Sequence, residues 1–265
     1  MHAKKQFSEV MSTCSIISAV LVVFIHTYNI GLYRNVSNSM IYWVEEFISQ
    51  FISRGAVPFF FISSAFFLYS SNKDVSAIYS SRFKSLGIPY LLWNTVYMVI
   101  FGILHHLSLT DSGMDEITLG NLFNGIFLHK YNYSYWFMRN LIIFTLLYPL
   151  IRLIISRSKV IAISIGVVFA ALVMIMPSKE SGTESFIYYY LGAIIGFYYS
   201  ESTEKLVVMS MKKKIILLMV FLAISILSFI ATNVYKFELS FIRNLMMVLF
   251  LFFAVSTFNI RIKGI

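Results

Sequence analysis

His26 is the one clear ionisable side chain deep within an apolar run, SAVLVVFIHTYN. Burying an ionisable group in hydrocarbon is costly, so such a residue usually faces a cavity or a partner. A desolvated imidazole stays neutral and can accept a proton from a hydroxyl. General base is therefore the natural chemical role of His26. The alternative interpretation is a structural histidine that is hydrogen-bonded inside a helix bundle.

Four other basic residues and one amide could take part in the same chemistry. Arg54 and Arg139 flank apolar runs, where a cation either contacts a substrate or extends to the membrane interface. Arg82 and Lys84, in SRFKSLGIPY, are either topology anchors or contacts to a phosphorylated cosubstrate. Residues two apart do not share a helix face, so this pair converges on one ligand only if the chain is irregular there. Asn94 requires a partner from a neighbouring helix or a polar cavity.

The elements that must position these residues are membrane-spanning helices. Hydrophobic residues make up 58% of the 265 positions and charged residues 12%, whereas soluble domains carry about 25% charged residues. About 20 apolar residues cross a bilayer as a helix. The sequence predicts an all-α bundle of about eight spans, in a single membrane domain over residues 1–265. The predicted spans are 12–33, 55–71, 85–104, 135–151, 160–177, 185–200, 214–232 and 241–258.

Two segments between the runs are read differently. Residues 40–54 contain Glu45 and Glu46 and are more amphipathic, which favours a helix lying in the membrane interface over a span. Residues 105–134 read as one exposed loop with some helix. His26 lies about 14 residues into the first predicted span, or roughly 21 Å along it, which places it past the midplane towards the outer side.

The distribution of Lys and Arg predicts the orientation. The N-terminus and the loops after spans 2, 4, 6 and 8 carry twice as many of these residues as the other loops, so both termini are expected in the cytoplasm. The formal net charge of +9 is thus a topology signal and not the mark of a nucleic-acid partner. Lys212, Lys213 and Lys214 are interpreted as a membrane-flanking anchor.

Several other kinds of site are not predicted. The single cysteine, Cys14, cannot form an intramolecular disulfide. His105, His106 and His129 lack a carboxylate or a cysteine at metal-ligand spacing, so no metal site is expected. No phosphate-binding loop, dinucleotide fingerprint or zinc motif occurs.

Five motifs in order resemble those of acyltransferase family 3, membrane proteins that include bacterial O-acetyltransferases of lipopolysaccharide and other glycans. The motifs are CSIISAVLVVFIHT, SRGAVPFFFISSAFFLY, SRFKSLGIPYLLWN, YWFMRNLIIFTLLYPLI and YYLGAIIGF. The resemblance covers roughly residues 8–200. It implies transfer of an acyl group, commonly acetyl from acetyl-CoA, to a hydroxyl of a cell-surface glycan or its lipid-linked precursor. A bacterial inner or plasma membrane is the implied location.

The resemblance also assigns roles to particular residues. His26 matches the histidine that closes the first-span motif and is implied to be catalytic. Arg82 matches the first arginine of a cytoplasmic Arg-x-Arg pattern associated with acyl-CoA binding, and Lys84 stands in place of the second. Arg54 and Arg139 fall in shared motifs. With Asn94, they are the possible contacts to substrate or to the oxyanion of the reaction.

Two departures from the family pattern leave other hypotheses open. Ser15 stands where the family often has an arginine, eleven residues before the histidine, and the chain has eight predicted spans where about ten are usual. An inactive remnant that lacks the last spans of the family is therefore one alternative. A glycan or lipid transporter is another, although the predicted spans contain no Asp or Glu of the kind that coupled transporters often carry.

Overall fold

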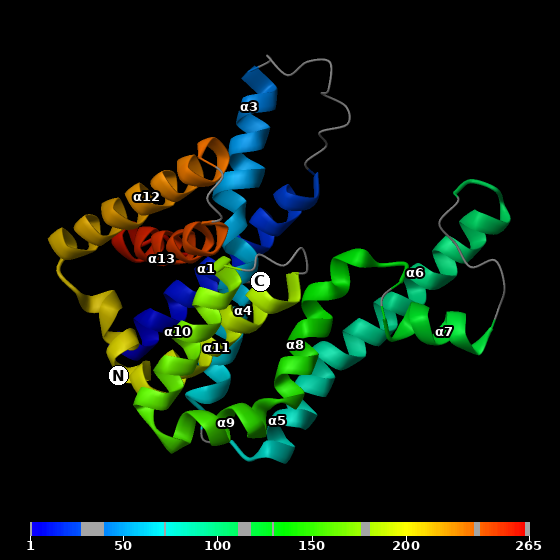
Figure 1. Ribbon diagram of the computed structural model, residues 1–265, viewed down its shortest axis with the longest axis horizontal. Helices are drawn as coiled ribbons and strands as arrows, with labels where there is room; N and C mark the ends of the chain where they lie inside the picture. Colours follow the sequence, from blue (N-terminus) through cyan, green and yellow to red (C-terminus); the bar gives the residue numbers. More distant parts are fainter. Residues whose placement is uncertain are drawn as a thin grey trace. The chain divides into compact units, whose positions relative to one another are not determined.

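The computed structural model describes most of the chain as helix. The ranges it describes are 2–27, 40–71, 73–110, 118–128, 130–175, 181–235 and 239–262. Within these ranges every regular element is a helix and no strand occurs (Figure 1). The predicted all-α class is confirmed.

The chain divides into two compact units. The first comprises Met1–Ser71 and Ile154–Ile265, and the second comprises Asn72–Leu153. The helices of the first unit are α1 (His2–Thr27), α3 (Met40–Glu46), the π-helix η1 (Phe47–Ile52), the 3-10 turn η2 (Ser53–Gly55), α4 (Ala56–Tyr69), α10 (Lys159–Ile175), α11 (Ser181–Lys205), η5 (Leu206–Val208), α12 (Met211–Val234) and α13 (Ser240–Phe258). That residues 1–265 act as a single domain stays a prediction.

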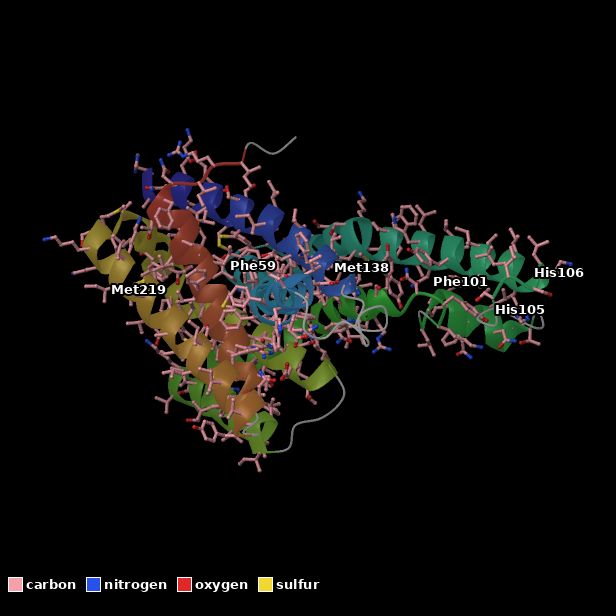
Figure 2. The ribbon with its side chains drawn as sticks, turned by 90° about the horizontal axis from the view of Figure 1, so that it is seen from above. Phe59, Phe101, His105, His106, Met138 and Met219 are labelled. Atoms are coloured by element: carbon pink, nitrogen blue, oxygen red, sulfur yellow. The ribbon has the colours of Figure 1, made fainter. Side chains whose placement is uncertain are left out.

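The helices of the second unit are α5 (Val75–Arg82), the π-helix η3 (Phe83–Gly87), α6 (Ile88–His106), α7 (Leu119–Ile126), η4 (Tyr133–Tyr135) and α8 (Trp136–Leu146), followed by most of α9 (Tyr148–Arg157). Phe101, His105 and His106 mark the C-terminal turns of α6 (Figure 2). The Tyr79 hydroxyl of α5 donates a hydrogen bond to the Leu146 carbonyl of α8, at 3.0 Å.

Five helices in the described ranges are long and apolar enough to cross a membrane. They are His2–His26, Trp43–Tyr69, Val75–His106, Met211–Val234 and Ser240–Phe258. A sixth span results if α8 and α9, bent by 58° at their junction, cross together. The predicted span 160–177 corresponds to α10, a shorter apolar helix, and the span 185–200 lies within α11. Each of the eight predicted spans overlaps a helix, and five or six of these helices qualify by length and composition.

Two helix boundaries differ from the sequence prediction. The helix that carries His26 begins at His2, well before residue 12, because Phe7 and Val10 are buried and extend its packed face towards the N-terminus. The prediction of a separate interfacial helix at 40–54 is wrong. α3, η1, η2 and α4 follow one another without a break, so Trp43–Tyr69 is one candidate span of 27 residues that contains a π-helical turn.

Large aliphatic side chains line the outside of α10 and α12. Val160 is 73% exposed, Val167 63%, Ile216 61% and Leu227 65%, and Met219 of α12 is exposed as well (Figure 2). In water these side chains would form an apolar patch much larger than soluble monomers carry. In a membrane, lipid tails cover this apolar surface, so its exposure to them carries no hydrophobic free-energy cost. The distribution is that of a multi-pass membrane protein.

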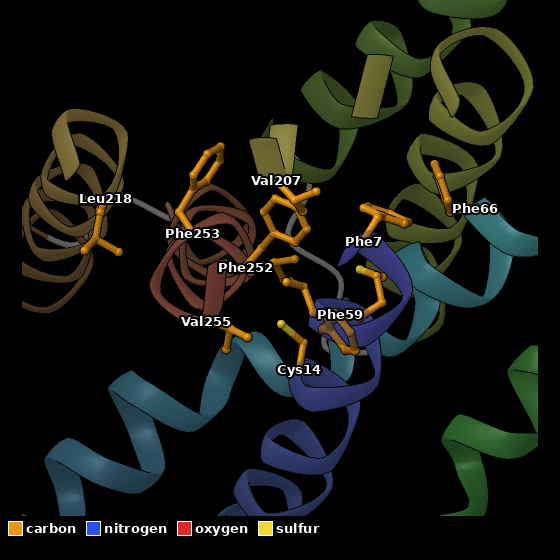
Figure 3. Packing of buried hydrophobic residues seen from close by; sticks show 12 residues of the cluster. Phe7, Cys14, Phe59, Phe66, Val207, Leu218, Phe252, Phe253 and Val255 are labelled. Atoms are coloured by element: carbon orange, nitrogen blue, oxygen red, sulfur yellow. The ribbon is translucent and has the colours of Figure 1, made fainter. Parts of the chain in front are cut away.

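Aromatic side chains form the core of the first unit. Phe7 and Cys14 of α1 pack with Phe59 and Phe66 of α4 and with Phe252 of α13 (Figure 3). The ring centroid of Phe7 lies 5.4 Å from that of Phe66 and 6.0 Å from that of Phe252. Ring pairs at such separations contribute about 0.5–1.5 kcal/mol each beyond the burial of their surface. The first turns of α1 are therefore part of the core.

Gly192 and Gly196 bring α11 against α4. A Cβ at Gly192 would lie 2.3 Å from the Ile62 carbonyl oxygen, and one at Gly196 would lie 2.4 Å from that of Phe66. Both obstacles are backbone atoms, so a side chain cannot be accommodated by a rotamer change. Small residues four apart let two helix backbones approach closely in membranes, where van der Waals packing drives association. The sequence motif YYLGAIIGF thus has a packing role that was not predicted.

Lys214 differs from its two neighbours. Lys212 and Lys213 are exposed, but Lys214 is 6% exposed and its Nζ donates to the carbonyl oxygens of Val207, at 2.5 Å, and Ser256, at 3.2 Å. Ser256 lies in the last turn of α13, where the helix dipole favours a cation. The prediction that all three lysines form a membrane-flanking anchor is therefore wrong for Lys214, which ties η5 and α12 to α13.

We predict that Gly192→Ala lowers the stability of the folded protein, because the new methyl group forces α11 away from α4. Overpacking of this kind costs about 1–3 kcal/mol. Gly102→Ala is the matched control, since a Cβ at Gly102 meets nothing within 4 Å. Thermal unfolding in detergent should show a lower midpoint for Gly192→Ala and an unchanged or higher one for Gly102→Ala. Equal midpoints would show that the close contact is not required.

Candidate functional site

His26 lies in the last turn of α1 and is exposed. The prediction placed it inside a span that runs to residue 33; the helix is described as far as Thr27, and residues 28–33 lie outside the described ranges. An α-helix rises about 1.5 Å per residue, so His26 lies roughly 36 Å along α1 from His2, the first residue of that helix. His26 therefore lies far along the helix from its N-terminal end, and its position within the predicted span stays a prediction.

Ser15 does not supply a substitute for the arginine that the family often has. Its hydroxyl donates to the Met11 carbonyl of its own helix, at 2.9 Å. Eleven residues are close to three helical turns, so Ser15 and His26 share a face of α1 about 16 Å apart. The polar group of Ser15 is thus used within α1.

Arg54 lies in η2, at the irregular junction between η1 and α4. Its Nη2 donates to Oε1 of Gln50, one turn earlier in the same helical segment. The next residue, Gly55, packs against α13, where a Cβ would lie 2.8 Å from Cβ of Met247. The Arg54 side chain is half-buried, and its guanidinium is hydrogen-bonded within its own segment. It is therefore more restricted than a side chain that extends along the membrane surface.

Arg82 and Lys84 lie where the backbone departs from an α-helix. Arg82 ends α5, and Lys84 lies in η3, the π-helical turn that leads into α6. The sequence argument required an irregular chain at this point, and the chain is irregular. Arg82 is half-buried and Lys84 is exposed, so the two cations have different surroundings. That both bind one ligand stays a prediction.

Asn94 and Arg139 meet around Tyr90 in the second unit. Asn94, 1% exposed, lies one turn after Tyr90 on the buried face of α6, and its Nδ2 donates to the Ile126 carbonyl at 3.2 Å. The Tyr90 hydroxyl donates to the Phe127 carbonyl at 2.7 Å. Tyr90 also lies within electrostatic range of Arg139 of α8. The structure thus brings together two of the candidate residues.

Aromatic rings border this polar group. The ring of Tyr90 stacks on that of Tyr135, with centroids 6.2 Å apart and planes at 27°. Sequence reasoning missed Tyr90. Its position four residues before Asn94 was an available signal, since residues at that spacing share one helix face.

Five buried polar atoms of the second unit have no hydrogen-bond partner within the described chain. They are Oδ1 of Asn94, the hydroxyl of Tyr131, Nδ2 of Asn132, Nε of Arg139 and Nδ2 of Asn140. Leaving a buried polar group unsatisfied costs about 1–3 kcal/mol. These atoms include acceptors and donors, which ordered water or ligand hydroxyl groups would satisfy. We call Tyr90, Asn94 and Arg139 the amide–guanidinium cluster.

The described residues contain no group of three or more His, Cys, Asp or Glu side chains that could hold a metal ion. The candidate residues offer an imidazole for proton transfer and guanidinium, amide and phenol groups for hydrogen bonding.

A family model described as an acyltransferase domain matches residues 16–264. The chain belongs to acyltransferase family 3. The match spans nearly the whole chain and confirms the resemblance carried by the sequence motifs, and with it a membrane acyltransferase in general terms. No curated protein and no solved structure matches the chain.

We predict that Asn94→Leu separates a binding role from a structural role for the amide–guanidinium cluster. Leucine has nearly the same size. It removes the unsatisfied Oδ1 together with the hydrogen bond to the Ile126 carbonyl, and these two effects on stability oppose each other. If the cluster binds substrate, acyl transfer should fall at least about tenfold while the unfolding midpoint changes little. The reason is that a substrate hydroxyl left without its hydrogen-bond partner costs about 1.5–3 kcal/mol.

Thr95→Val is the matched control, because the Thr95 hydroxyl donates only to the Leu91 carbonyl of its own helix. A large fall in unfolding temperature for Asn94→Leu, with normal activity per folded molecule, would assign Asn94 to the fold alone.

Proposed function

We propose that this protein is a membrane-bound O-acyltransferase of the cell membrane. It would move an acyl group, most simply acetyl, from acyl-CoA to a hydroxyl of a cell-surface glycan or of its lipid-linked precursor. The observation that carries the proposal is the family match over residues 16–264, within which His26 closes the first motif. The bilayer, acyl-CoA and a glycan or lipid-linked sugar are the proposed partners.

His26 is the proposed general base. A neutral imidazole nitrogen takes the proton of the acceptor hydroxyl, and the hydroxyl oxygen attacks the thioester carbonyl carbon. The carbon–sulfur bond then breaks, and the CoA thiolate leaves with the proton from the imidazolium. His26 stands at the carbonyl end of α1, where the helix dipole favours the positive charge that it would carry between these steps.

The carbonyl oxygen becomes negative during attack and needs a hydrogen-bond donor. Arg54, Asn94 and Arg139 were the candidates. The free polar atom of Asn94 is Oδ1, an acceptor, whereas Arg139 keeps the donor Nε without a partner. Within the second unit, Arg139 is therefore the better hydrogen-bond donor and Asn94 the better acceptor, and Arg54 stays the candidate of the first unit.

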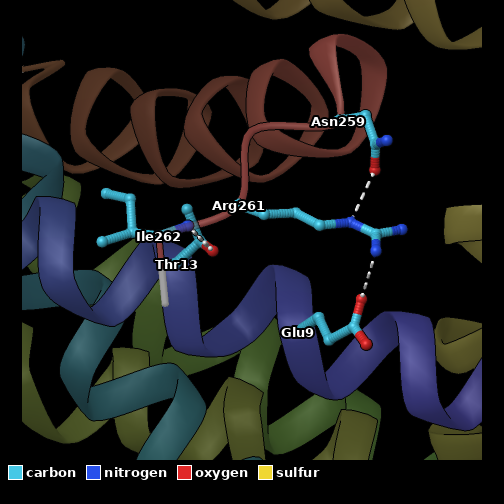
Figure 4. Close-up of polar contacts among 5 residues, drawn as sticks. All are labelled: Glu9, Thr13, Asn259, Arg261 and Ile262. Carbon is cyan, nitrogen blue, oxygen red and sulfur yellow. Dashed lines mark hydrogen bonds and ion pairs between the residues drawn. The ribbon is translucent and has the colours of Figure 1, made fainter. Parts of the chain in front are cut away.

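The proposed topology has eight spans, with both termini in the cytoplasm of a bacterium. Two observations support it. Each predicted span overlaps a helix. The C-terminal segment runs beside the N-terminal half of α1, with Arg261 at 3.5 Å from Glu9 and the Ile262 amide at 3.4 Å from the Thr13 hydroxyl, which favours placing both termini on one side (Figure 4).

We predict that Arg82→Gln with Lys84→Gln raises the apparent KM for acyl-CoA about tenfold or more, because charge-assisted bonds to the phosphates of the donor are removed. The maximal rate should change much less. Lys73→Gln, an exposed cation just before α5, is the control and should keep the wild-type donor dependence. If the double variant keeps the wild-type KM for acyl-CoA, both residues serve only as topology anchors.

We predict that His26→Gln folds normally in the membrane and loses acyl transfer, since glutamine keeps a hydrogen bond but cannot act as a base. Transfer of labelled acetyl from acetyl-CoA to glycan in membranes carrying the protein should fall about 10²–10⁴-fold. His106→Gln, at an exposed position that ends α6, should keep full activity.

Full activity per folded molecule in His26→Gln would contradict the assignment of His26 as the general base. Transfer by neither variant nor wild type would favour the inactive remnant. Acetyl-CoA-independent movement of glycan across the membrane would favour the transporter.

A further inference from the structure

A polar cavity of about 280 Å³ lies at the end of the first unit that carries both described chain ends. Its walls come from the first turns of α1 and from the residues that follow α13. The residues that line it include His2, Lys5, Glu9, Ser256, Asn259 and Arg261. It uses none of the residues assigned above to proton transfer or donor binding, and residues 2–9 precede the segment that matches the family.

Contacts between the two segments build the cavity wall. The Arg261 Nη1 lies 3.5 Å from a carboxylate oxygen of Glu9, and its Nε donates to Oδ1 of Asn259 at 3.2 Å (Figure 4). Asn259 has a left-handed backbone, with φ of 49°, that ends α13 and turns the chain back towards α1. Two of the five N–H donors of the Arg261 guanidinium are used in these contacts, so the others remain for a ligand.

Ser256 supplies an independent sign of a missing partner. It is 5% exposed, it lines the cavity, and its Oγ has no hydrogen-bond partner within the described chain. Its carbonyl, by contrast, accepts a hydrogen bond from the buried Lys214 at 3.2 Å. A buried hydroxyl without a partner is costly. A ligand oxygen in the cavity would satisfy it.

The charge around the cavity selects an anion. Two cationic side chains, Lys5 and Arg261, and one carboxylate, Glu9, line the cavity. Because Arg261 forms an ion pair with Glu9, the charge of Lys5 is left without a carboxylate to balance it. Helix α1 begins at His2, another lining residue, so the unsatisfied N–H groups of its first turn add partial positive charge. Cationic side chains, amide and hydroxyl donors and a helix N-terminus together form the donor set that phosphate groups prefer.

We propose that this cavity binds a phosphate group and thereby joins the start of α1 to the end of α13. The phosphate belongs either to a soluble phosphate compound or to the headgroup of an anionic lipid, because both present the same oxygens. The proposal does not depend on the acyltransferase reaction.

The test uses the full-length protein in nanodiscs and reads the midpoint of thermal unfolding. In phosphatidylcholine discs, inorganic phosphate should raise the midpoint of the wild type relative to chloride at equal ionic strength, because a ligand that binds only the folded state stabilises it. In discs that contain phosphatidylglycerol, a lipid source predicts a higher midpoint without added phosphate and a weaker further response to it. A soluble source predicts the same phosphate response in both kinds of disc.

The variants decide whether the cavity is responsible. Lys5→Gln with Arg261→Gln should weaken the response to the phosphate group at least about tenfold in concentration, since charged hydrogen bonds are removed. Lys212→Gln with Lys213→Gln removes two exposed cations outside the cavity and should leave the response unchanged. Ser256→Ala keeps every charge, so it should weaken the response a few-fold even if the double cavity variant is less stable.

No response of the wild type to either phosphate source would overturn the proposal. So would equal responses in the cavity variants and the wild type, or an equal loss in the Lys212 and Lys213 control.

Discussion

Hydrocarbon offers no hydrogen-bond partner, and the structure depends on this constraint. Every backbone polar group within a span must be satisfied by the chain itself, which leaves helices as the form of an open chain that can cross. Hydroxyl groups follow the same rule by bonding to their own helix, as Ser15 does to Met11 and Thr95 does to Leu91. The exceptions are informative, because a polar group that remains unsatisfied in this setting marks a place where a ligand or water is needed.

Association of the helices cannot rely on exclusion of water, since lipid tails are as apolar as the side chains. Close contact takes its place. Gly192 lets α11 approach the backbone of α4, and Gly55 lets the segment before α4 approach α13 at Met247. Lys214 adds hydrogen bonds, because its Nζ donates to a carbonyl of η5 and to a carbonyl of α13. A lysine can be buried at this position because the last turn of α13 presents carbonyl oxygens with no helical partner of their own.

Sequence reasoning reached the fold class and the family because both depend on local signals, namely apolar runs, charge bias and ordered motifs. It began the first helix at residue 12 and not at His2, because an amphipathic first turn that buries Phe7 does not look like a span. It missed Tyr90 although the spacing from Asn94 was available, and it missed the buried state of Lys214 for another reason. That state depends on which carbonyl oxygens of distant segments lie opposite the lysine, and the sequence does not show them.

In the proposed topology, α1 carries His26 to the opposite side of the membrane from both chain ends. On this arrangement the acceptor reaches the base from outside, while acyl-CoA arrives from the cytoplasm. The claim rests on the length of α1 and on the contacts that hold Arg261 beside Glu9.

Thiol accessibility tests it most directly, since the one native cysteine, Cys14, is fully buried. Cysteines placed singly at His26 and at Lys213 can be labelled in intact cells with a reagent that does not cross membranes. The account predicts that His26→Cys reacts in intact cells and that Lys213→Cys reacts only after the membrane is opened. Labelling of both from the same side would contradict it.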